Sequence, residues 1–364
     1  MVNSELKFLV TPGHICVWEG TELARPTLAH IAQEAGTAIS TVSRVLSGKE
    51  TKVKISHETR ERIIQIARAL DYQPNMAART LAAREARALG VVLRDPERIK
   101  NPHISEIVAG ISRVADEREL PLVWYFQQGE KLSPLSLLGD RRVDGGIVLE
   151  DDILPDSEIE AIARSDFPLV LMGPYPQRDG LHLVASDDDA GMEAAVDHVV
   201  AQGARRLAHL GSTRHWAGFL RQQGFLRACE RHGLSEEARV HEVNWRPAEA
   251  EKIVEQEQRG SDPPTAYLCS NDLLALAAIS GVHKAKRRVP EDVLVVGFND
   301  SVFAQYNSPS LTTVRRPLVQ MGKEACHLLC ALAYEKADDP PSVILPTQLI
   351  VRQSSVATNA ACDF

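Results

Sequence analysis

The chain has 364 residues, 44% of them apolar and 25% charged, a composition of ordinary globular proteins and a length that implies two or three domains. No run of about 20 apolar residues occurs, so no membrane-spanning helix is expected. The net charge of -8 argues against a protein whose whole surface binds nucleic acid. However, residues 26–89 carry ten Lys/Arg and six Asp/Glu, so a weakly basic segment precedes an acidic body.

Residues 1–25 contain a short apolar patch but lack the basic leader and apolar core of a signal peptide, and no function is assigned to them. The six cysteines are scattered, without a C-x-x-C pair. Cys326 and Cys330 lie four apart in a predicted helix, but no partner at metal-site spacing accompanies them. The cysteines are therefore expected to be buried free thiols. No metal and no cofactor is expected.

Residues 27–46, TLAHIAQEAGTAISTVSRVL, predict two short helices around a turn at Gly36. The first helix has an apolar stripe at helical spacing, formed by Leu28, Ile31, Ala32 and Ala35. The second has an apolar face of Val42, Val45 and Leu46 and an opposite face of Ile39, Ser40, Ser43 and Arg44. That second face could enter a DNA major groove, although a helical hairpin without a ligand would have the same pattern.

A third helix is predicted from Ser56, a good N-cap, through Leu70. The succession TLAHIAQEAG, STVSRVL, SHETRERI, LDYQPNMAARTL and LGVV resembles the N-terminal part of the LacI–GalR family of bacterial transcription regulators. The resemblance continues through almost the whole chain.

The resemblance implies that the second helix reads DNA bases. Ile39 would contact a thymine methyl group, Ser40 a base edge, and Arg44 a guanine, while Thr27, Thr41 and Ser43 would contact phosphates. Ala38 is a departure, because the family usually places a helix-capping serine there. The segment Met76–Ala83 matches the family's hinge helix, with Leu81 as a wedge in the minor groove and Asn75, Ala78 and Arg79 beside it. A plain linker is the alternative.

From Ala88 onward, short apolar runs alternate with helical stretches, which predicts parallel sheets with helices on both faces. The predicted strands are LGVVL, PLVWYF, GGIVL, FPLVLM, RRLAHL, TAYLC and DVLVVGF. The predicted helices include 105–118, 190–202, 272–286 and 317–337, with a last strand at 348–353. Residues 127–142 are shorter than in the family, which predicts a short or irregular helix there.

The later phrases NPHISEIVAGI, RQQGF, SNDLLALAA, VPEDVLVVGFND and PSLTTVRRPLVQMG also follow the family order. They resemble the family's sensor domain, which has the fold of periplasmic sugar-binding proteins: two lobes, crossed by three strands, that close on a small molecule. The predicted fold is therefore a small all-α helix-turn-helix head joined to an α/β two-lobed sensor.

The predicted boundaries are an extension at 1–25, the DNA-binding domain at 26–74, the hinge at 75–87, the sensor at 88–357 and a tail at 358–364. Within the sensor, lobe 1 takes about 88–185 and 317–345, and lobe 2 takes about 186–316 and 346–357.

The resemblance places the effector against six residues: His103, Ser105, Arg221, Trp245, Asn271 and Asn299. Arg221 would grip two ligand oxygens, and Trp245 would stack on a sugar ring. Their alternatives are a surface ion pair and a core aromatic. Asp272, next to Asn271, could instead cap the following helix. Asn299 departs from the family's usual Asp, which puts a cationic or purine-like ligand at this group in doubt.

The first hypothesis is a cytoplasmic transcription regulator, expected to be a repressor, that binds operator DNA as a homodimer under control of a small molecule, expected to be a carbohydrate. A regulator with a degenerate or non-sugar site, and a solute-binding protein without DNA function, are the alternatives. An enzyme is not expected, because no P-loop, G-x-S-x-G or G-x-G-x-x-G motif occurs. The run Asp187–Asp189 is interpreted as acidic residues at a helix N-terminus.

Overall fold

The computed structural model describes residues 26–47, 55–72, 85–93, 96–126, 133–139, 142–149, 154–337 and 339–356. The chain divides into two compact units, Met1–Ala82 and Ala83–Phe364. The predicted hinge residues Asn75, Ala78, Arg79 and Leu81 lie outside the described residues, as do the extension at 1–25 and the tail at 358–364.

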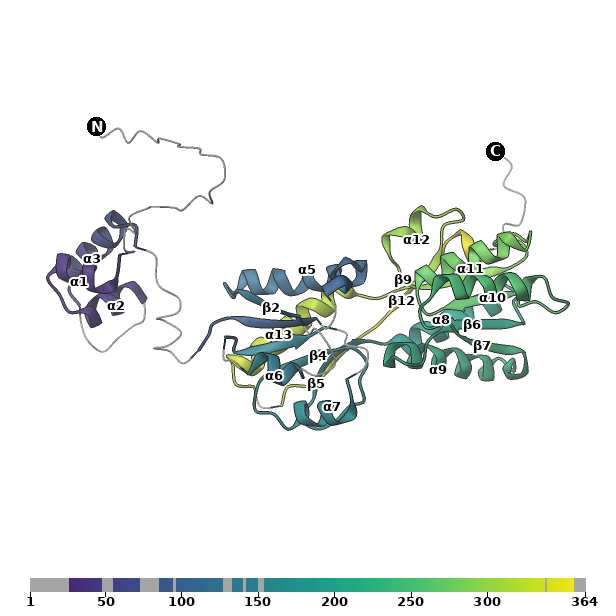
Figure 1. Cartoon of the computed structure of the whole chain (residues 1–364), viewed down its shortest axis with the longest axis horizontal. Coiled ribbons are helices and arrows are strands. Elements are labelled where there is room, and N and C mark those ends of the chain that lie inside the picture. The colour runs from purple at the N-terminus through teal and green to yellow at the C-terminus, as the bar shows by residue number, and fades with distance from the viewer. Residues whose placement is uncertain are drawn as a thin grey trace, which may run out of the picture. The chain divides into compact units, whose positions relative to one another are not determined.

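The described residues of the first unit form three helices: α1 (Leu28–Ala35), α2 (Ile39–Ser47) and α3 (His57–Ala69) (Figure 1). Gly36 ends α1 in the left-handed conformation, with φ of 62°, which only glycine adopts without strain, and the chain turns there as predicted. Ser56 caps α3 by accepting a hydrogen bond from the Thr59 backbone N–H, again as predicted. The apolar faces form one core: Ile31, Ala32, Ala35, Val42, Val45, Ile63 and Ala67.

In the second unit, lobe 1 is built on a six-stranded parallel sheet of order β11-β5-β4-β3-β1-β2. Its strands are β1 (Leu89–Leu93), β2 (Leu122–Phe126), β3 (Gly145–Val148), β4 (Leu169–Met172), β5 (His182–Ser186) and β11 (Val343–Leu345). Helices α5 (Pro102–Glu117) and α13 (Leu318–Ala333) pack side by side on one face, and α7 (Asp156–Ala163) packs on the other. The short α6 (Pro134–Leu138) fulfils the expectation of a shortened helix in this region.

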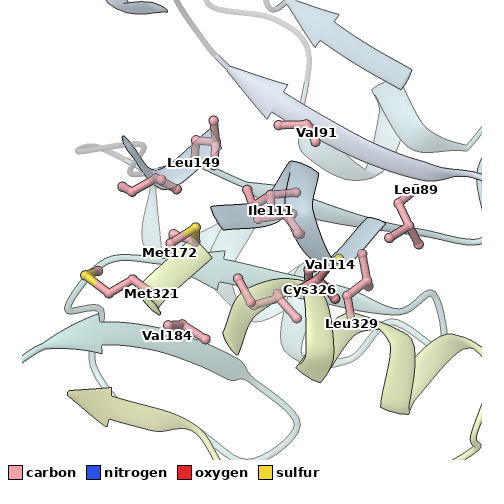
Figure 2. Close-up of a cluster of buried hydrophobic side chains, with 14 of the residues drawn as sticks. Leu89, Val91, Ile111, Val114, Leu149, Met172, Val184, Met321, Cys326 and Leu329 are labelled. Carbon is pink, nitrogen blue, oxygen red and sulfur yellow. The ribbon is translucent and has the colours of Figure 1, made fainter. Parts of the chain in front are cut away.

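The core of lobe 1 follows from the alternation of side chains along its strands. Figure 2 shows Ile111 and Val114 of α5 and Met321, Cys326 and Leu329 of α13 packed with buried strand residues. Intervening strand residues, such as Val92 and Val148, face the opposite side of the sheet. Because these strands are buried on both faces of the sheet, their residues are almost all apolar, which explains the continuous apolar runs from which they were predicted.

Lobe 2 repeats this plan with the order β12-β10-β9-β8-β6-β7. Its strands are β6 (Leu207–Gly211), β7 (Ala238–Glu242), β8 (Ala266–Cys269), β9 (Leu294–Asn299), β10 (Thr312–Arg315) and β12 (Gln348–Ile350). Its helices are α8 (Asp188–Ala201), α9 (Trp216–Arg231), α10 (Pro247–Gln258), α11 (Asp272–Lys284) and α12 (Val302–Tyr306). Helices α8 and α9 cover one face, and α10 and α11 the other. Short 3-10 turns occur at Pro96–Lys100, Ser235–Glu237 and Gln353–Ser355.

The chain passes between the two sheets three times: from β5 to α8, from β10 to α13 and from β11 to β12. Four strands were not predicted, namely β5, β7, β10 and β11. Of these, β11 has only three residues, and β7 and β10 carry several polar residues, for example the buried Thr312 and Thr313 of β10. One pairing, β10 with β12, is antiparallel rather than parallel.

The described cysteines, Cys229, Cys269, Cys326 and Cys330, are buried free thiols, as expected. Across the described ranges, no helix is long and apolar enough to span a membrane.

Candidate functional site

A cavity lies between lobe 1 and lobe 2 and is lined by residues of both lobes. Three of the six predicted effector residues, His103, Asn271 and Asn299, line it. The remaining lining residues are Asn101, Pro102, Glu106, Asp272, Leu273, Ser301, Phe303 and Leu318.

The lining segments all follow carboxyl ends of parallel strands. They are the starts of α5, α11 and α13 and the turn from β9 into α12. In doubly wound sheets, ligands bind outside the carboxyl ends of the strands, because the loops and helix N-termini gather there. The topology of both lobes thus places this cavity where a ligand is expected.

The lobe 2 wall begins with Asn271, whose side-chain oxygen caps α11 by accepting a hydrogen bond from the Leu274 N–H at 2.8 Å. The cap is therefore Asn271, and the suggestion that Asp272 serves this purpose is wrong. The Asp272 carboxylate is only 2% exposed and accepts hydrogen bonds from the Thr313 hydroxyl at 2.5 Å and the Ser301 N–H at 2.6 Å. Burial raises the pKa of Asp272 to about 6.

Asn299 ends β9 in a strained conformation, with φ of 104°, and Asp300 follows with φ of 54°. The Asn299 side-chain oxygen is buried without a hydrogen-bond partner among the described residues. A buried polar atom without a partner costs free energy, so such groups occur where a ligand or water completes them. Backbone strain and an unsatisfied oxygen at one turn make this wall the strongest indication of a binding site.

The lobe 1 wall is the first turn of α5. His103 and Glu106 are three residues apart and share one face of the helix. Burial, and then repulsion from Asp300, raise the pKa of Glu106, while the Arg315 guanidinium opposes this shift. Ser105 does not line the cavity, and its hydroxyl donates to the Asn101 carbonyl oxygen at 3.1 Å.

Arg221 does not line the cavity either. Its guanidinium donates to the Asp188 carboxylate at 2.7 and 3.0 Å and to the Ser270 carbonyl oxygen at 2.6 Å, and lies 4.0 Å above the Phe298 ring. Both side chains of the Arg221–Asp188 pair are buried, so this is not the surface salt bridge considered as the alternative. Its role toward an effector stays a prediction.

Asp188 also connects to the passage between the lobes. Arg316, which follows β10, donates to the Ser186 hydroxyl at 2.7 Å, and that hydroxyl donates to Asp188 at 2.5 Å. Asp187 caps α8 by accepting from the Ala190 N–H, as the acidic run predicted. No group of His, Cys, Asp or Glu side chains in the described ranges is placed to hold a metal ion.

Trp245 lies away from the cavity lining, with its ring 5.8 Å from that of His215 and packed against the core beneath α10 and α11. The alternative considered for Trp245 was a core aromatic, and its packing against this core agrees with that alternative. Stacking of Trp245 on a ligand stays a prediction.

The lining residues that sequence reasoning missed are Asn101, Pro102, Glu106, Asp272, Leu273, Ser301, Phe303 and Leu318. One available signal was spacing, because Glu106 is one helical turn from His103. Another was position along the chain, because the predicted strand ends at Phe298 and Ser301 lies only two residues after Asn299.

In the head, α2 has the two faces that its sequence predicted. Val42 and Val45 are buried, whereas Ile39 is 52% exposed. The outward face also carries the exposed Ser40, Ser43 and Arg44, with Thr41 half-buried beside them. Thr27 caps α1 through a hydrogen bond from the His30 N–H to its hydroxyl. Ala38 precedes α2 and has no side chain that could cap it.

Comparison with known proteins connects these two sites. Residues 27–75 match the family described as bacterial regulatory proteins, lacI family, and residues 196–355 match a periplasmic binding protein-like domain. The transcriptional regulator CelR of Thermobifida fusca is 30% identical over 344 residues, which cover 91% of this chain and 98% of CelR. The chain belongs to the LacI family.

Solved structures of the LacI family agree with this assignment. A CelR–cellobiose complex is 27% identical with a TM-score of 0.65, covering 91% of this chain and 100% of the other. A Lac repressor dimer bound to operator and the anti-inducer ONPF is 25% identical with a TM-score of 0.78, covering 91% of this chain and 99% of the other. This LacI-family protein is therefore a DNA-binding transcription regulator with a helix-turn-helix head and a two-lobed sensor.

Proposed function

We propose that this regulator is a repressor that binds a pseudo-palindromic operator as a homodimer, and that a carbohydrate in the cavity between the lobes controls its DNA affinity. The observation that supports this most directly is the strained turn at Asn299–Ser301, which lines the cavity and contains a buried Asn299 side-chain oxygen without a hydrogen-bond partner among the described residues. A polyol supplies the hydrogen-bond donors that such an oxygen needs. Relatives crystallised with cellobiose or with operator DNA support the same proposal.

The cavity also offers the apolar surface that a sugar ring requires. Phe303 and Leu273 are 49% and 52% exposed and line the same space as the polar groups. Hydroxyl recognition combined with an apolar platform is the usual chemistry of carbohydrate sites.

The proposed coupling runs through the hinge at residues 75–87. An effector that binds the closed lobes more tightly than the open lobes shifts the population between them. In this proposal, Leu81 of each subunit enters the minor groove in only one of the two arrangements. Such a protein acts in the bacterial cytoplasm, where operator DNA is found.

Arg44 provides the test of DNA recognition. The purified chain selects its operator from a random duplex pool, and fluorescence anisotropy gives the dissociation constants. Changing Arg44 to Ala should cost about 1–3 kcal/mol on the selected operator and relax the preference for one base pair, because a bidentate guanine contact is lost.

Arg62→Ala is the matched control, since Arg62 is an exposed arginine on α3 of the same head. Its loss should weaken binding modestly and equally for all sequences. If the Arg44 variant keeps both the affinity and the base preference of the wild type, α2 does not read bases through this residue. If no duplex is selected at all, the regulator proposal itself fails.

A further inference from the structure

The cavity between the lobes is lined by carboxylates and not by strong cations. Glu106 contributes one carboxylate from lobe 1 and Asp272 another from lobe 2. Among the lining residues that the structure describes, none is a lysine or an arginine, and His103 is the only basic side chain.

The arginines nearest to this wall are already engaged by other carboxylates. Arg315 and Arg352 each donate to Asp300 at 2.7 Å, one to each carboxylate oxygen. Arg221 and Arg316 converge on the buried Asp188 instead. Each pair of guanidinium groups therefore shares one carboxylate, and none of these four arginines is among the residues that line the cavity.

The two lining carboxylates differ in what they can offer a ligand. Asp272 is buried and already accepts hydrogen bonds from Thr313 and Ser301, so it acts as a fixed part of the floor. Glu106 is exposed on the first turn of α5. It is close enough to Asp300 of lobe 2 for that carboxylate to raise its pKa. A ligand between the lobes would therefore meet Glu106 directly.

We propose that this cavity selects its effector by charge: it binds a polyol that is neutral or carries an amine and rejects the phosphorylated counterpart, and Glu106 is the residue that sets this selection. The proposal rests on the proposed function, because it concerns the same cavity.

The physical reason is that a polyol hydroxyl can donate a hydrogen bond to Glu106, to the Asn299 oxygen or to Ser301. An ammonium group does the same and gains charge attraction at Glu106. A phosphate, with a charge between about −1 and −2 near neutral pH, has few donors and would be repelled by two carboxylates in a partly desolvated space. The cavity offers it no arginine fork or lysine in compensation.

The test uses the full-length protein and matched sets of sugars: glucose, glucosamine and glucose 6-phosphate; galactose, galactosamine and galactose 6-phosphate; ribose and ribose 5-phosphate; and cellobiose. A thermal-shift screen identifies the sugars that bind, and calorimetry gives their dissociation constants. The wild type should bind a neutral or amine-bearing member at least about tenfold more tightly than its phosphorylated counterpart.

Glu106→Gln keeps the size and hydrogen-bonding capacity of the side chain and removes its charge. It should reduce the discrimination against phosphate roughly tenfold and remove any advantage of an amine. Glu117→Gln is the matched control, because it makes the same change at the other end of α5, on an exposed residue away from the cavity. It should leave the ratio unchanged.

Tighter or equal binding of a phosphorylated member by the wild type would overturn the proposal. An unchanged ratio in the Glu106 variant would overturn the role of this residue. If no neutral or amine-bearing member binds, the ligand class named here is wrong. The operator assay separates these failures from failure of the proposed function, since DNA selection by the wild type does not depend on which sugar binds.

Discussion

Two predicted effector residues show how much a role depends on neighbours. Asn299 lines the cavity, and its strained backbone and unsatisfied oxygen follow from its place at the end of β9. Arg221 has the side chain best suited to grip a ligand, yet its donors are used by Asp188 and the Ser270 carbonyl. Replacing Arg221 by Ala would therefore leave a buried carboxylate with fewer partners, and a loss of effector response would not by itself identify a ligand contact.

His209 gives a pH prediction at the same scale. It lies in β6, 1% exposed, with Nε2 within 3.0 Å of the Ser270 hydroxyl. Burial, assisted by the positive charge of Arg221, lowers its pKa from 6.5 to about 3. The folded state therefore favours neutral His209, and this contribution to stability is complete above pH 6.5 and decreases as the pH falls toward 3.

Changing His209 to Gln removes this titration and retains a polar side chain. Between pH 6.5 and pH 4, the free energy of unfolding of the wild type should fall relative to the variant by about 3 kcal/mol. Urea unfolding at a series of pH values measures the difference. Parallel pH profiles for the two proteins would show that His209 is not held neutral.

At the scale of elements, the backbones of α5 and α13 lie unusually close to each other. Both helices carry a glycine where they meet, Gly110 and Gly322. A Cβ at Gly110 would overlap the carbonyl oxygen of Val319, and one at Gly322 would overlap that of Ile107. Because these obstacles are backbone atoms within packed helices, they cannot move aside as a side-chain end could.

Gly110→Ala should lower the free energy of unfolding by about 2–3 kcal/mol, even though alanine is the better helix former, because the helices must move apart. Chemical denaturation measures this change. Gly233→Ala is a control in which a Cβ has nothing within 4 Å, and only the left-handed backbone, with φ of 67°, is strained. It should cost about 1–2 kcal/mol. A smaller loss for Gly110 than for Gly233 would contradict the close packing.

At the scale of the whole molecule, each unit contains its own core. The head core uses residues between Leu28 and Tyr72, whereas the four other core clusters use residues from Ala86 onward. A chain that begins at Ala83 should therefore fold, retain ligand binding in the cavity and lose operator binding.

Thermal unfolding, the sugar screen and operator anisotropy check these three outcomes in one preparation. The melting temperature of the truncated chain should lie within a few degrees of the sensor transition in the full chain, because the truncation removes no residue of a sensor core cluster. Aggregation or loss of the cooperative transition would mean that the sensor needs the head to fold.

The sequence by itself determined the alternation of strands and helices, the helix-turn-helix and the two-lobed α/β sensor. These follow from local properties: apolar periodicity, a glycine at the turn after α1, and serine or asparagine at helix starts. The same properties explain the strands that were missed, because β11 has three residues, β7 and β10 are largely polar, and β5 has only three consecutive apolar residues. A family resemblance could assign roles to matching positions, but only by analogy.

Tertiary structure alone decided which polar groups face the cavity and which are used inside the protein. Arg221 and Asp188 are 33 residues apart and form a buried pair, whereas Glu106 and Asp272 line one cavity from different lobes. These arrangements depend on contacts between strands and helices that are distant in sequence. A side chain's type gives the hydrogen bonds it can make, and only its folded neighbours decide whether any remain for a ligand.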